Sequence, residues 1–349
     1  MTEQSMTKRD PSSMKKLLID FPRQVEDAVR IGSSAPLKPL RRDPHSVLVT
    51  GLGGSAIGGD LLRSYLADDL AIPFLVNRHY FLPEFIDDRS LVLVSSYSGN
   101  TEETIAAHKD AIRRKAQVIC ISSNGTTAAM AVKHRQSLVT IPRGYPPRAA
   151  LGYSFFAPLM VLTRLKLIRS RERDILETLA LLRKSAARFA KPGPHNKAMQ
   201  IARKLHGTLP IVYSSADRFD SVNVRWRGQI AENGKMLAFG HVLPEMNHNE
   251  LVGWNVGQGT MKKMTVVMLR DREDHPRVRI RMAITRSVVR EYAGDVLEVQ
   301  SEGSSLLARM FSLIALGDWV SYYLAMLNHV DPTPVSVIDL LKKKLGLVK

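Results

Sequence analysis

The sequence predicts an α/β protein built from two tandem, doubly wound parallel sheets. Short apolar runs of strand length alternate with amphipathic helical patterns, which is typical of chains that cross over between parallel strands. This alternation restarts after residues 188–197, where two prolines bracket a glycine. The 349 residues also exceed the roughly 250 to 300 at which a single core stops growing. We therefore expect domains over residues 46–187 and 198–349, joined by the linker 188–197 and preceded by a helical segment over residues 1–45.

Composition points to a soluble globular protein, with 44% apolar and 24% charged residues. Because the chain has no unbroken apolar run of about 18 residues and no apolar signal-peptide core near its start, we expect a cytoplasmic protein without a membrane partner. Cys120 is the sole cysteine and lies in the apolar run VICIS. It is expected to be a small core residue, and disulfide frameworks and cysteine-based metal sites are excluded.

The net charge of +17 admits three interpretations: a nucleic-acid partner, an anionic small substrate, or solubility. The basic residues are dispersed, and most lie on helical patterns with apolar residues beneath them, as Arg277 and Arg281 do over Val278 and Met282. No aromatic interleaving or recognised nucleic-acid motif accompanies them. We interpret these residues as solvated helix faces and expect no nucleic-acid partner.

The first half begins with an amphipathic helix over residues 14–30, interrupted near Pro22, and a loop over residues 32–44. Residues 46–50 (SVLVT) form the first expected strand, residues 51–59 (GLGGSAIGG) a glycine-rich turn, and residues 60–66 the helix that follows. Five glycines in nine residues would let the backbone approach a ligand closely. The spacing is not that of a dinucleotide fingerprint, and no P-loop lysine follows.

Further expected strands cover residues 73–76, 91–94, 117–122 and 137–141. After the strand at 91–94, the turn SSYSGN leads to Thr101, which is expected to open a helix toward Ala111. Three hydroxyls, on Ser96, Ser98 and Thr101, surround Gly99. Helix capping is the ordinary explanation for such residues, but three hydroxyls around one glycine exceed what one helix start needs. The turn therefore suits a bound phosphate.

Loops that leave the carboxyl ends of adjacent parallel strands converge on one crevice. Ser55 and the Ser96–Thr101 cluster could thus face the same ligand. Arg148 follows the strand at 137–141 and could clamp a phosphate there, or could be an ordinary surface arginine. The residues leave both interpretations open.

In the second half, strands are expected over residues 210–214, 265–269 and 295–299, and helices over 198–205, 222–231 and 276–292. Glu232 lies at a helix end with Gly234 as the expected C-cap, and His248 lies in the loop LPEMNHNELVGW. A carboxylate and an imidazole can move protons at neutral pH. A solvated acid and a surface histidine are the alternatives, because neither signal is specific by itself.

The apolar run FSLIALGDWVSYYLAML contains one carboxylate, Asp318. It could bind a sugar or orient a partner, but a buried, hydrogen-bonded structural acid is the favoured interpretation. The neighbouring aromatic residues Trp319, Tyr322 and Tyr323 are expected in the core or at a dimer contact.

Six segments, in the same order, resemble the bifunctional phosphoglucose/phosphomannose isomerases of archaea and bacteria, a branch of the sugar isomerase (SIS) domain family. The segments are GLGGSAIGGDLL, SSYSGNTEETI, PPRAALGY, AENGK, LPEMNHNELVGW and GDWVSYYLAMLNHVDPTPVSVIDLLKKKLG. The resemblance implies two flavodoxin-like SIS domains and a homodimer with its site near the subunit interface. One departure is visible, since many members read Asn-Glu-Asn-Ala-Lys where residues 231–235 read Ala-Glu-Asn-Gly-Lys.

The resemblance also implies roles for individual residues. Glu232 matches the catalytic base, His248 the ring-opening histidine, and Arg148 an arginine near the phosphate and the reacting carbons. Expected ligands of the phosphate and the sugar are Gly54, Ser55, Ser96, Ser98, Thr101, Arg148 and Thr333, and Lys342 is expected to approach the sugar and help stabilise the oxyanion.

The implied reaction is the metal-free, cofactor-free interconversion of glucose 6-phosphate and mannose 6-phosphate with fructose 6-phosphate through a cis-enediol. Two rival classes share the fold: a phosphosugar-binding regulator, which would lack the base, and an aminosugar-phosphate enzyme, which would need an amine-handling site. Glu232 together with His248 argues against both.

Overall fold

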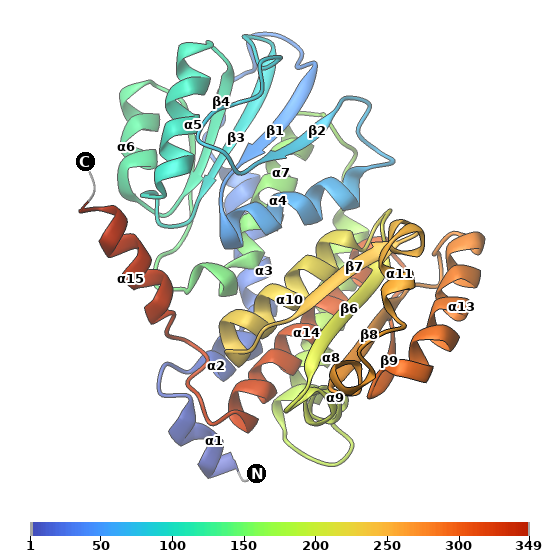
Figure 1. Cartoon of the computed structure of the whole chain (residues 1–349). Coiled ribbons are helices and arrows are strands. Elements are labelled where there is room, and N and C mark those ends of the chain that lie inside the picture. The colour runs from blue at the N-terminus through green and yellow to red at the C-terminus, as the bar shows by residue number, and fades with distance from the viewer. Residues whose placement is uncertain (1–2, 348–349) are drawn as a thin grey trace.

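The computed structural model describes residues 3–347 and has two parallel sheets, each covered by helices on both faces (Figure 1). The first sheet has the strand order β2-β1-β3-β4-β5 and the second has the order β7-β6-β8-β9. Every neighbouring pair of strands is parallel. The predicted fold class is therefore confirmed.

In the first sheet, the apolar runs predicted the strands because both faces of the sheet are buried. All seven residues of the central strand β3 are buried, and β1 and β4 are buried throughout. The strands are β1 (Ser46–Thr50), β2 (Phe74–Asn77), β3 (Ser90–Ser96), β4 (Gln117–Ser122) and β5 (Ser137–Thr140).

Different helices cover the two faces of this sheet. One face packs against α3 (Phe21–Ser34), α4 (Gly53–Leu66) and α7 (Leu151–Arg164). The other face packs against α5 (Glu102–Arg113) and α6 (Gly125–Lys133), where Ala107, Ala111 and Ala131 are buried. Cys120 is part of this second core, as predicted, and burial raises its thiol pKa to about 12.

The glycine-rich turn is a correction to the sequence prediction, because α4 begins at Gly53 rather than at residue 60. Its glycines serve close packing inside a helix. A Cβ on Gly58 would lie 2.5 Å from the Ser154 carbonyl oxygen, and one on Gly59 would lie 2.9 Å from Val49 Cγ1. Tertiary packing of α4 against β1 and α7 thus outweighs the low helix propensity of glycine.

The segment before the first sheet is helical, as expected. It comprises α1 (Glu3–Arg9), α2 (Met14–Ile19) and α3, with the interruption at Asp20 and Pro22 in the first turn of α3. The α3 helix packs along α7, and residues 35–45 then lead to β1.

The second sheet consists of β6 (Leu209–Ser215), β7 (Phe239–Leu243), β8 (Met264–Arg270) and β9 (Asp295–Gln300). The sequence analysis missed β7. Its residues FGHVL lie at the sheet edge and are mostly exposed or half-buried, so they lack the apolar run of a central strand. Around this sheet lie α9 (Lys197–Leu205), α10 (Asp220–Gly234), η2 (Glu245–His248), α11 (Glu250–Gly253), α12 (Gln258–Met261) and α13 (Pro276–Tyr292).

The longest helix of the described chain, α14 (Leu306–Leu327), is long and apolar enough to cross a membrane by length and composition, yet 94% of its most apolar window is buried inside the protein. It packs against α9, α10 and α8 (Glu172–Ala190). Trp319, Tyr322 and Tyr323 are buried there, in agreement with the prediction of a core position.

One continuous apolar core joins the two sheets. It runs from Val47 in β1 through Phe155 in α7 and Phe311 in α14 to Val212 in β6. The rings of Phe155 and Phe311 lie edge to face with centroids 5.0 Å apart. The predicted boundaries of the two domains and of the 188–197 linker stay a prediction.

At the C-terminal end, α15 (Ser336–Leu345) lies apart from the helices that cover the second sheet (Figure 1). None of its residues is buried, and Val337, Leu340, Leu341 and Leu345 are each more than half exposed. The helix therefore presents an apolar face to solvent.

Candidate active site

The turn after β3 gathers hydroxyl groups in front of the first turn of α5. Ser96 Oγ accepts a hydrogen bond from Gly99 N–H (3.1 Å), and Ser98 Oγ accepts one from Asn100 N–H (3.3 Å). Thr101 is the N-cap of α5, but within residues 3–347 its hydroxyl caps no backbone N–H. Ser96 and Ser98 act only as acceptors in these bonds, and Thr101 makes no such bond, so each hydroxyl keeps its proton. These protons can be donated to an anion bound at the helix N-terminus.

Gly99 is required at the centre of this turn. Its φ of +70° lies in the left-handed region, and a Cβ there would come within 1.7 Å of the Asn124 carbonyl oxygen. Ser55, from the first turn of α4, accepts a hydrogen bond from Tyr97 N–H (3.2 Å). The predicted convergence of Ser55 with the turn after β3 is thus present.

Arg148 lies directly against the start of α4. It sits in the short helix η1 (Pro147–Ala149), and a Cβ on Gly54 would lie 2.3 Å from the Pro147 carbonyl oxygen. Only glycine permits this approach. The Arg148 side chain is 4% exposed, so it is not a surface arginine, and its predicted contact with a phosphate stays a prediction.

Three hydrogen bonds to other parts of the chain fix the Arg148 guanidinium. Nε donates to Asn233 Oδ1 (2.6 Å), and Nη2 donates to the carbonyl oxygens of Pro332 and Thr333 (2.7 Å each). Burial lowers the pKa of Arg148, while the nearby Glu232 carboxylate opposes that effect. The arginine thereby joins the first sheet, α10 and the C-terminal segment.

Glu232 stands in the last turn of α10, with Oε2 3.4 Å from Arg148 Nη1. Its side chain is 35% exposed because it borders a cavity of about 180 Å³. Gly53, Gly54, Ile57, Arg78, Arg148, Val224, Arg225, Gly228, Gln229 and Glu232 line this cavity. A half-buried carboxylate beside a fixed guanidinium can move a proton while the cation stabilises negative charge on the substrate.

The C-terminal segment closes the same region. Thr333 bonds Arg148 through its backbone carbonyl, while its side-chain Oγ1 is buried without a partner among the described residues. Such an unpartnered hydroxyl suits a bound sugar hydroxyl. Thr333 thus lies beside Arg148, and its expected contact with a sugar stays a prediction.

Several expected site residues do not line this cavity. Outside its lining lie Ser55, Ser96, Ser98, Thr101 and Thr333. His248 is exposed at the end of η2, and Lys342 is exposed on α15. Neither lines the cavity that contains Glu232. The described residues thus bring Arg148 and Glu232 together at one cavity, and the turn after β3 adjoins the start of α4 through Ser55.

The helix end at Glu232 also differs from expectation in its cap. The C-cap is Lys235, with a left-handed φ of 55°, and not Gly234, which is the last residue of α10. Gly234 packs closely against α14, since a Cβ there would lie 3.3 Å from Leu324 Cβ.

Sequence reasoning missed Arg225, Gln229 and Arg78 around the cavity. Arg225 and Gln229 face inward from α10 and bind Asp318 of α14 (2.6 and 2.9 Å), so Asp318 is the buried structural acid that was predicted. The sequence does carry one indication of Arg225 and Gln229. They are spaced four and three residues from each other and from Glu232, which places all three on one helix face. Arg78 pairs with Asp60, and no local pattern marks it.

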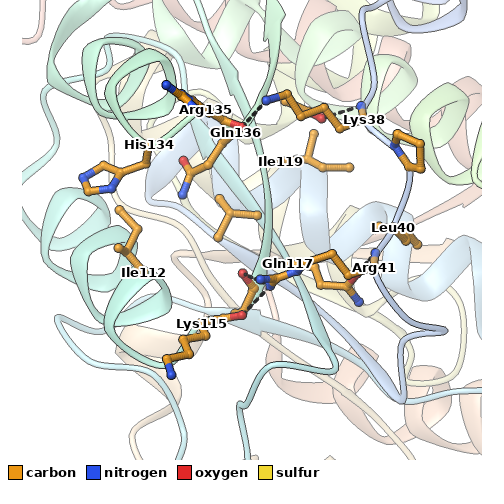
Figure 2. A pocket seen from close by; sticks show the side chains of 14 residues that line it. Lys38, Leu40, Arg41, Ile112, Lys115, Gln117, Ile119, His134, Arg135 and Gln136 are labelled. Carbon is orange, nitrogen blue, oxygen red and sulfur yellow. Dashed lines mark hydrogen bonds between the residues drawn. The ribbon is translucent and has the colours of Figure 1, made fainter.

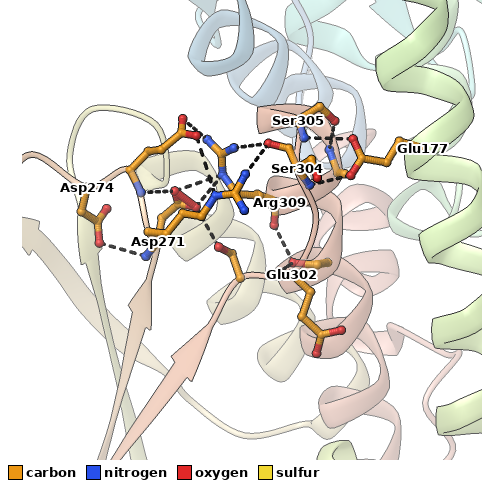
Figure 3. A network of polar contacts seen from close by, with 12 residues as sticks. Glu177, Asp271, Asp274, Glu302, Ser304, Ser305 and Arg309 are labelled. Carbon is orange, nitrogen blue, oxygen red and sulfur yellow. Dashed lines mark hydrogen bonds and ion pairs between the residues drawn. The ribbon is translucent and has the colours of Figure 1, made fainter.

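The corresponding position of the second sheet is acidic rather than hydroxyl-rich (Figure 3). There β8 takes the place of β3, and the residues after it are Asp271, Glu273 and Asp274, of which Asp271 receives Arg309 Nε at 2.9 Å. Carboxylates at this position disfavour a phosphate. An anion therefore has its more favourable position at the first sheet.

Another cavity, of about 350 Å³, lies at the amino edge of the first sheet (Figure 2). Its cationic side chains Lys38 and Arg41 donate to backbone carbonyls of Arg135 and Lys115. No carboxylate is among the described residues that line it, so it offers no carboxylate base. Within residues 3–347, no group of three or more His, Cys, Asp or Glu residues is arranged to hold a metal ion, and the metal-free site stays a prediction.

The comparisons with known proteins agree with this geometry. Residues 194–345 match the family model of the bacterial phospho-glucose isomerase C-terminal SIS domain. The chain is 44% identical to a bifunctional phosphoglucose/phosphomannose isomerase of Caldicellulosiruptor bescii over 96% of this chain and 100% of that protein. It is 34% identical to the protein of that name from Aquifex aeolicus over 86% of this chain and 90% of the relative.

Among solved structures, a hypothetical protein from Thermus thermophilus matches with a TM-score of 0.76 and 16% identity, over 99% of this chain and 93% of that chain. This likeness shows the fold. The sequence identity with the curated proteins carries the assignment further, and the chain belongs to the family of bifunctional phosphoglucose/phosphomannose isomerases.

Proposed function

We propose that this chain interconverts glucose 6-phosphate and mannose 6-phosphate with fructose 6-phosphate, without a metal or cofactor. The observation that carries the proposal is the Glu232 carboxylate held 3.4 Å from the immobilised guanidinium of Arg148, beside Gly54. The names of the curated relatives support the substrate class.

The phosphate binds the hydroxyls of Ser55, Ser96, Ser98 and Thr101 and the first N–H groups of α5. This contact is remote from the reacting carbons, so its binding energy serves to fix C1 and C2 of the open-chain sugar. Gly54 contacts η1 and precedes Ser55, so the residues proposed to hold the phosphate and Arg148 both adjoin the start of α4.

Glu232 acts as the base. It removes the proton from C2 of the aldose, the electron pair forms the C1–C2 double bond, and the carbonyl oxygen at C1 becomes the enediolate oxyanion. Arg148 stabilises this charge, joined by Lys342 when the C-terminal helix approaches. Glu232 then returns the proton to C1, while the C2 hydroxyl proton passes to O1 and leaves a C2 carbonyl.

His248 opens the pyranose ring by moving a proton between the ring oxygen and the anomeric hydroxyl. Since His248 is exposed and lies outside the cavity of its own chain, we assign it to the cavity of a second copy in a homodimer. The exposed apolar face of α15 supports such an assembly. A ten-residue helix that buries none of its residues gains little stability without a partner.

Two measurements on the purified chain test these proposals. The first follows fructose 6-phosphate formation from each aldose with chelator present, for the wild type, for Glu232→Gln and for Glu291→Gln, a matched change on the exposed side of α13. Turnover of both sugars that is lost in Glu232→Gln and kept in Glu291→Gln is expected. Turnover of glucose 6-phosphate but not of mannose 6-phosphate would contradict the proposed activity on mannose 6-phosphate. Phosphosugar binding without turnover of either sugar would indicate a regulator instead of an enzyme.

The second measurement is the mass of the protein in solution by light scattering. A mass of two chains is expected, falling toward one chain in Leu341→Glu, which places a charge on the apolar face of α15. A single-chain mass for the wild type would refute the homodimer.

A further inference from the structure

The guanidinium of Arg148 has five N–H donors, and the protein itself occupies three of them. Nε donates to Asn233, and both Nη2 protons go to the backbone carbonyls of Pro332 and Thr333. The two N–H groups of Nη1 remain. Within residues 3–347 they meet one acceptor, Glu232 Oε2 at 3.4 Å, which is a long contact.

Asn233 is itself held in one orientation. Its side chain is fully buried, and Nδ2 donates to Ser321 Oγ at 2.9 Å. The Ser321 hydroxyl in turn donates to the Asp318 carbonyl oxygen at 2.7 Å. With its NH₂ group committed to Ser321, Asn233 can present only its amide oxygen to Arg148.

Lys235 holds one of the other two acceptors of the guanidinium, the carbonyl oxygen of Pro332. Its ammonium group donates to the carbonyl oxygens of Pro332 (3.3 Å) and Pro334, and also to that of Glu232. Burial, followed by the proximity of Arg148, lowers the pKa of Lys235. The segment that receives Nη2 is thus tied to the same helix end that carries Glu232.

We infer that Asn233 is a positioning residue for the isomerisation: its amide oxygen turns the Arg148 guanidinium so that Nη1 faces Glu232 and the cavity. The inference rests on the proposed function, in which Nη1 stabilises the enediolate. Without an acceptor at Nε, the guanidinium rotates about its long side chain and the Nη1 protons leave the reacting oxygen. A displacement of about 1 Å at such a group can cost about a hundredfold in rate.

The test compares Asn233→Leu, Asn233→Asp and Ser321→Ala with the wild type. Leucine keeps the volume and removes the acceptor, so we expect kcat to fall about a hundredfold while KM changes less than about threefold. Aspartate keeps an acceptor for Nε, so we expect it to retain kcat within about tenfold of the wild type.

Ser321→Ala removes the partner of Nδ2 and leaves the Nε contact, so its kcat should exceed that of Asn233→Leu by at least about tenfold. Equal losses in Ser321→Ala and Asn233→Leu would show a merely structural role and overturn the inference, as would a loss of kcat in Asn233→Asp as large as that in Asn233→Leu. If Asn233→Leu does not fold, Asn233→Asp decides, and a kcat below about a tenth of the wild-type value in that variant overturns the inference. An inactive wild type would defeat the proposed function, whereas an active wild type with a fully active Asn233→Leu defeats only this inference.

Discussion

Arg225 and Asp318 form a buried ion pair directly behind Arg148. Arg225 Nη2 lies 2.6 Å from Asp318 Oδ2, and the two side chains are 4% and 7% exposed. The same Nη2 also donates to the Arg148 carbonyl oxygen at 3.2 Å. Burial raises the pKa of Asp318, and its contacts with Arg225 and Gln229 oppose that shift. The pair therefore connects α14 and α10 to the backbone of Arg148.

Removal of Asp318 should destabilise the protein strongly. Asp318→Leu leaves the Arg225 charge buried without its counter-ion, and a loss of about 3 to 5 kcal/mol in the free energy of unfolding is expected by urea titration. The surface pair of Asp295 with Lys204 is the control, and Asp295→Asn should cost less than about 1 kcal/mol. Adding Arg225→Met to Asp318→Leu should recover part of the loss; equal costs for the buried and surface variants would contradict this account.

Mixed dimers should restore activity between two inactive variants. In a homodimer with His248 supplied across the interface, a Glu232→Gln chain paired with a His248→Ala chain retains one site in which both residues are intact. Unfolding and refolding the variants together in equal amounts should yield about a quarter of the wild-type kcat, because half of the dimers are mixed and each has one working site of two. Activity no higher than that of the separate variants would place His248 in the site of its own chain.

Substitution at Gly54 should impair both activity and stability. In Gly54→Ala the new Cβ would lie 2.3 Å from the Pro147 carbonyl oxygen, so η1 and Arg148 must shift. We expect kcat/KM to fall at least about a hundredfold. Gly228 lines the same cavity, but no atom lies within 4 Å of a Cβ placed there. Gly228→Ala should therefore keep its fold and gain about 0.5 to 1 kcal/mol of stability from helix propensity; a similar gain in Gly54→Ala would disprove the close contact.

Acidification should destabilise the first sheet through His108. This residue is fully buried, and burial lowers the pKa of its imidazole, with the nearby His134 acting in the same direction. Its Nε2 bonds Gln136 Oε1 (2.7 Å) and lies 3.7 Å from the thiol of Cys120. Because the unfolded chain binds the proton more readily, stability is full above the unfolded pKa of about 6.5 and falls as pH drops below it.

The measurement for this effect is the free energy of unfolding between pH 7.5 and 5.0. His108 should contribute a slope of up to about 1.4 kcal/mol per pH unit, and that slope should be absent from His108→Gln. His45→Gln is a suitable control, since His45 is more than a third exposed and pairs with Asp87 at the surface. Parallel pH profiles for the wild type and His108→Gln would refute the assignment.

The sequence predicted those parts of the fold that depend on local pattern. The central strands are apolar along their whole length because both faces are buried, and α13 has the predicted bounds because Pro276 starts it and Tyr292 ends its periodic pattern. The edge strand β7 has neither an apolar run nor a clear alternation, so it escaped notice. The start of α4 was misplaced because propensity says nothing about the close contacts that its glycines permit.

The candidate site also has parts that the local sequence pattern predicts and parts that it does not. The turn after β3 and the helix end at Glu232 are contiguous in sequence and were recognisable as candidates. The contacts that orient Arg148 come from Asn233 and Pro332, 85 and 184 residues away along the chain. Contacts between residues so far apart leave no local sequence pattern. The resemblance pointed to Arg148 without showing which residues hold its side chain.

The apolar core shared by the two sheets has a consequence for how the protein folds and how its halves are inherited. Phe311 of α14 packs on Phe155 of α7, so either half expressed by itself would expose rings that the other half covers. Calorimetry should thus record one cooperative transition rather than two. For the same reason, replacing one half by that of a distant relative would place mismatched side chains at the contact between the halves. Substitutions on the two sides of this contact must therefore accompany one another in evolution.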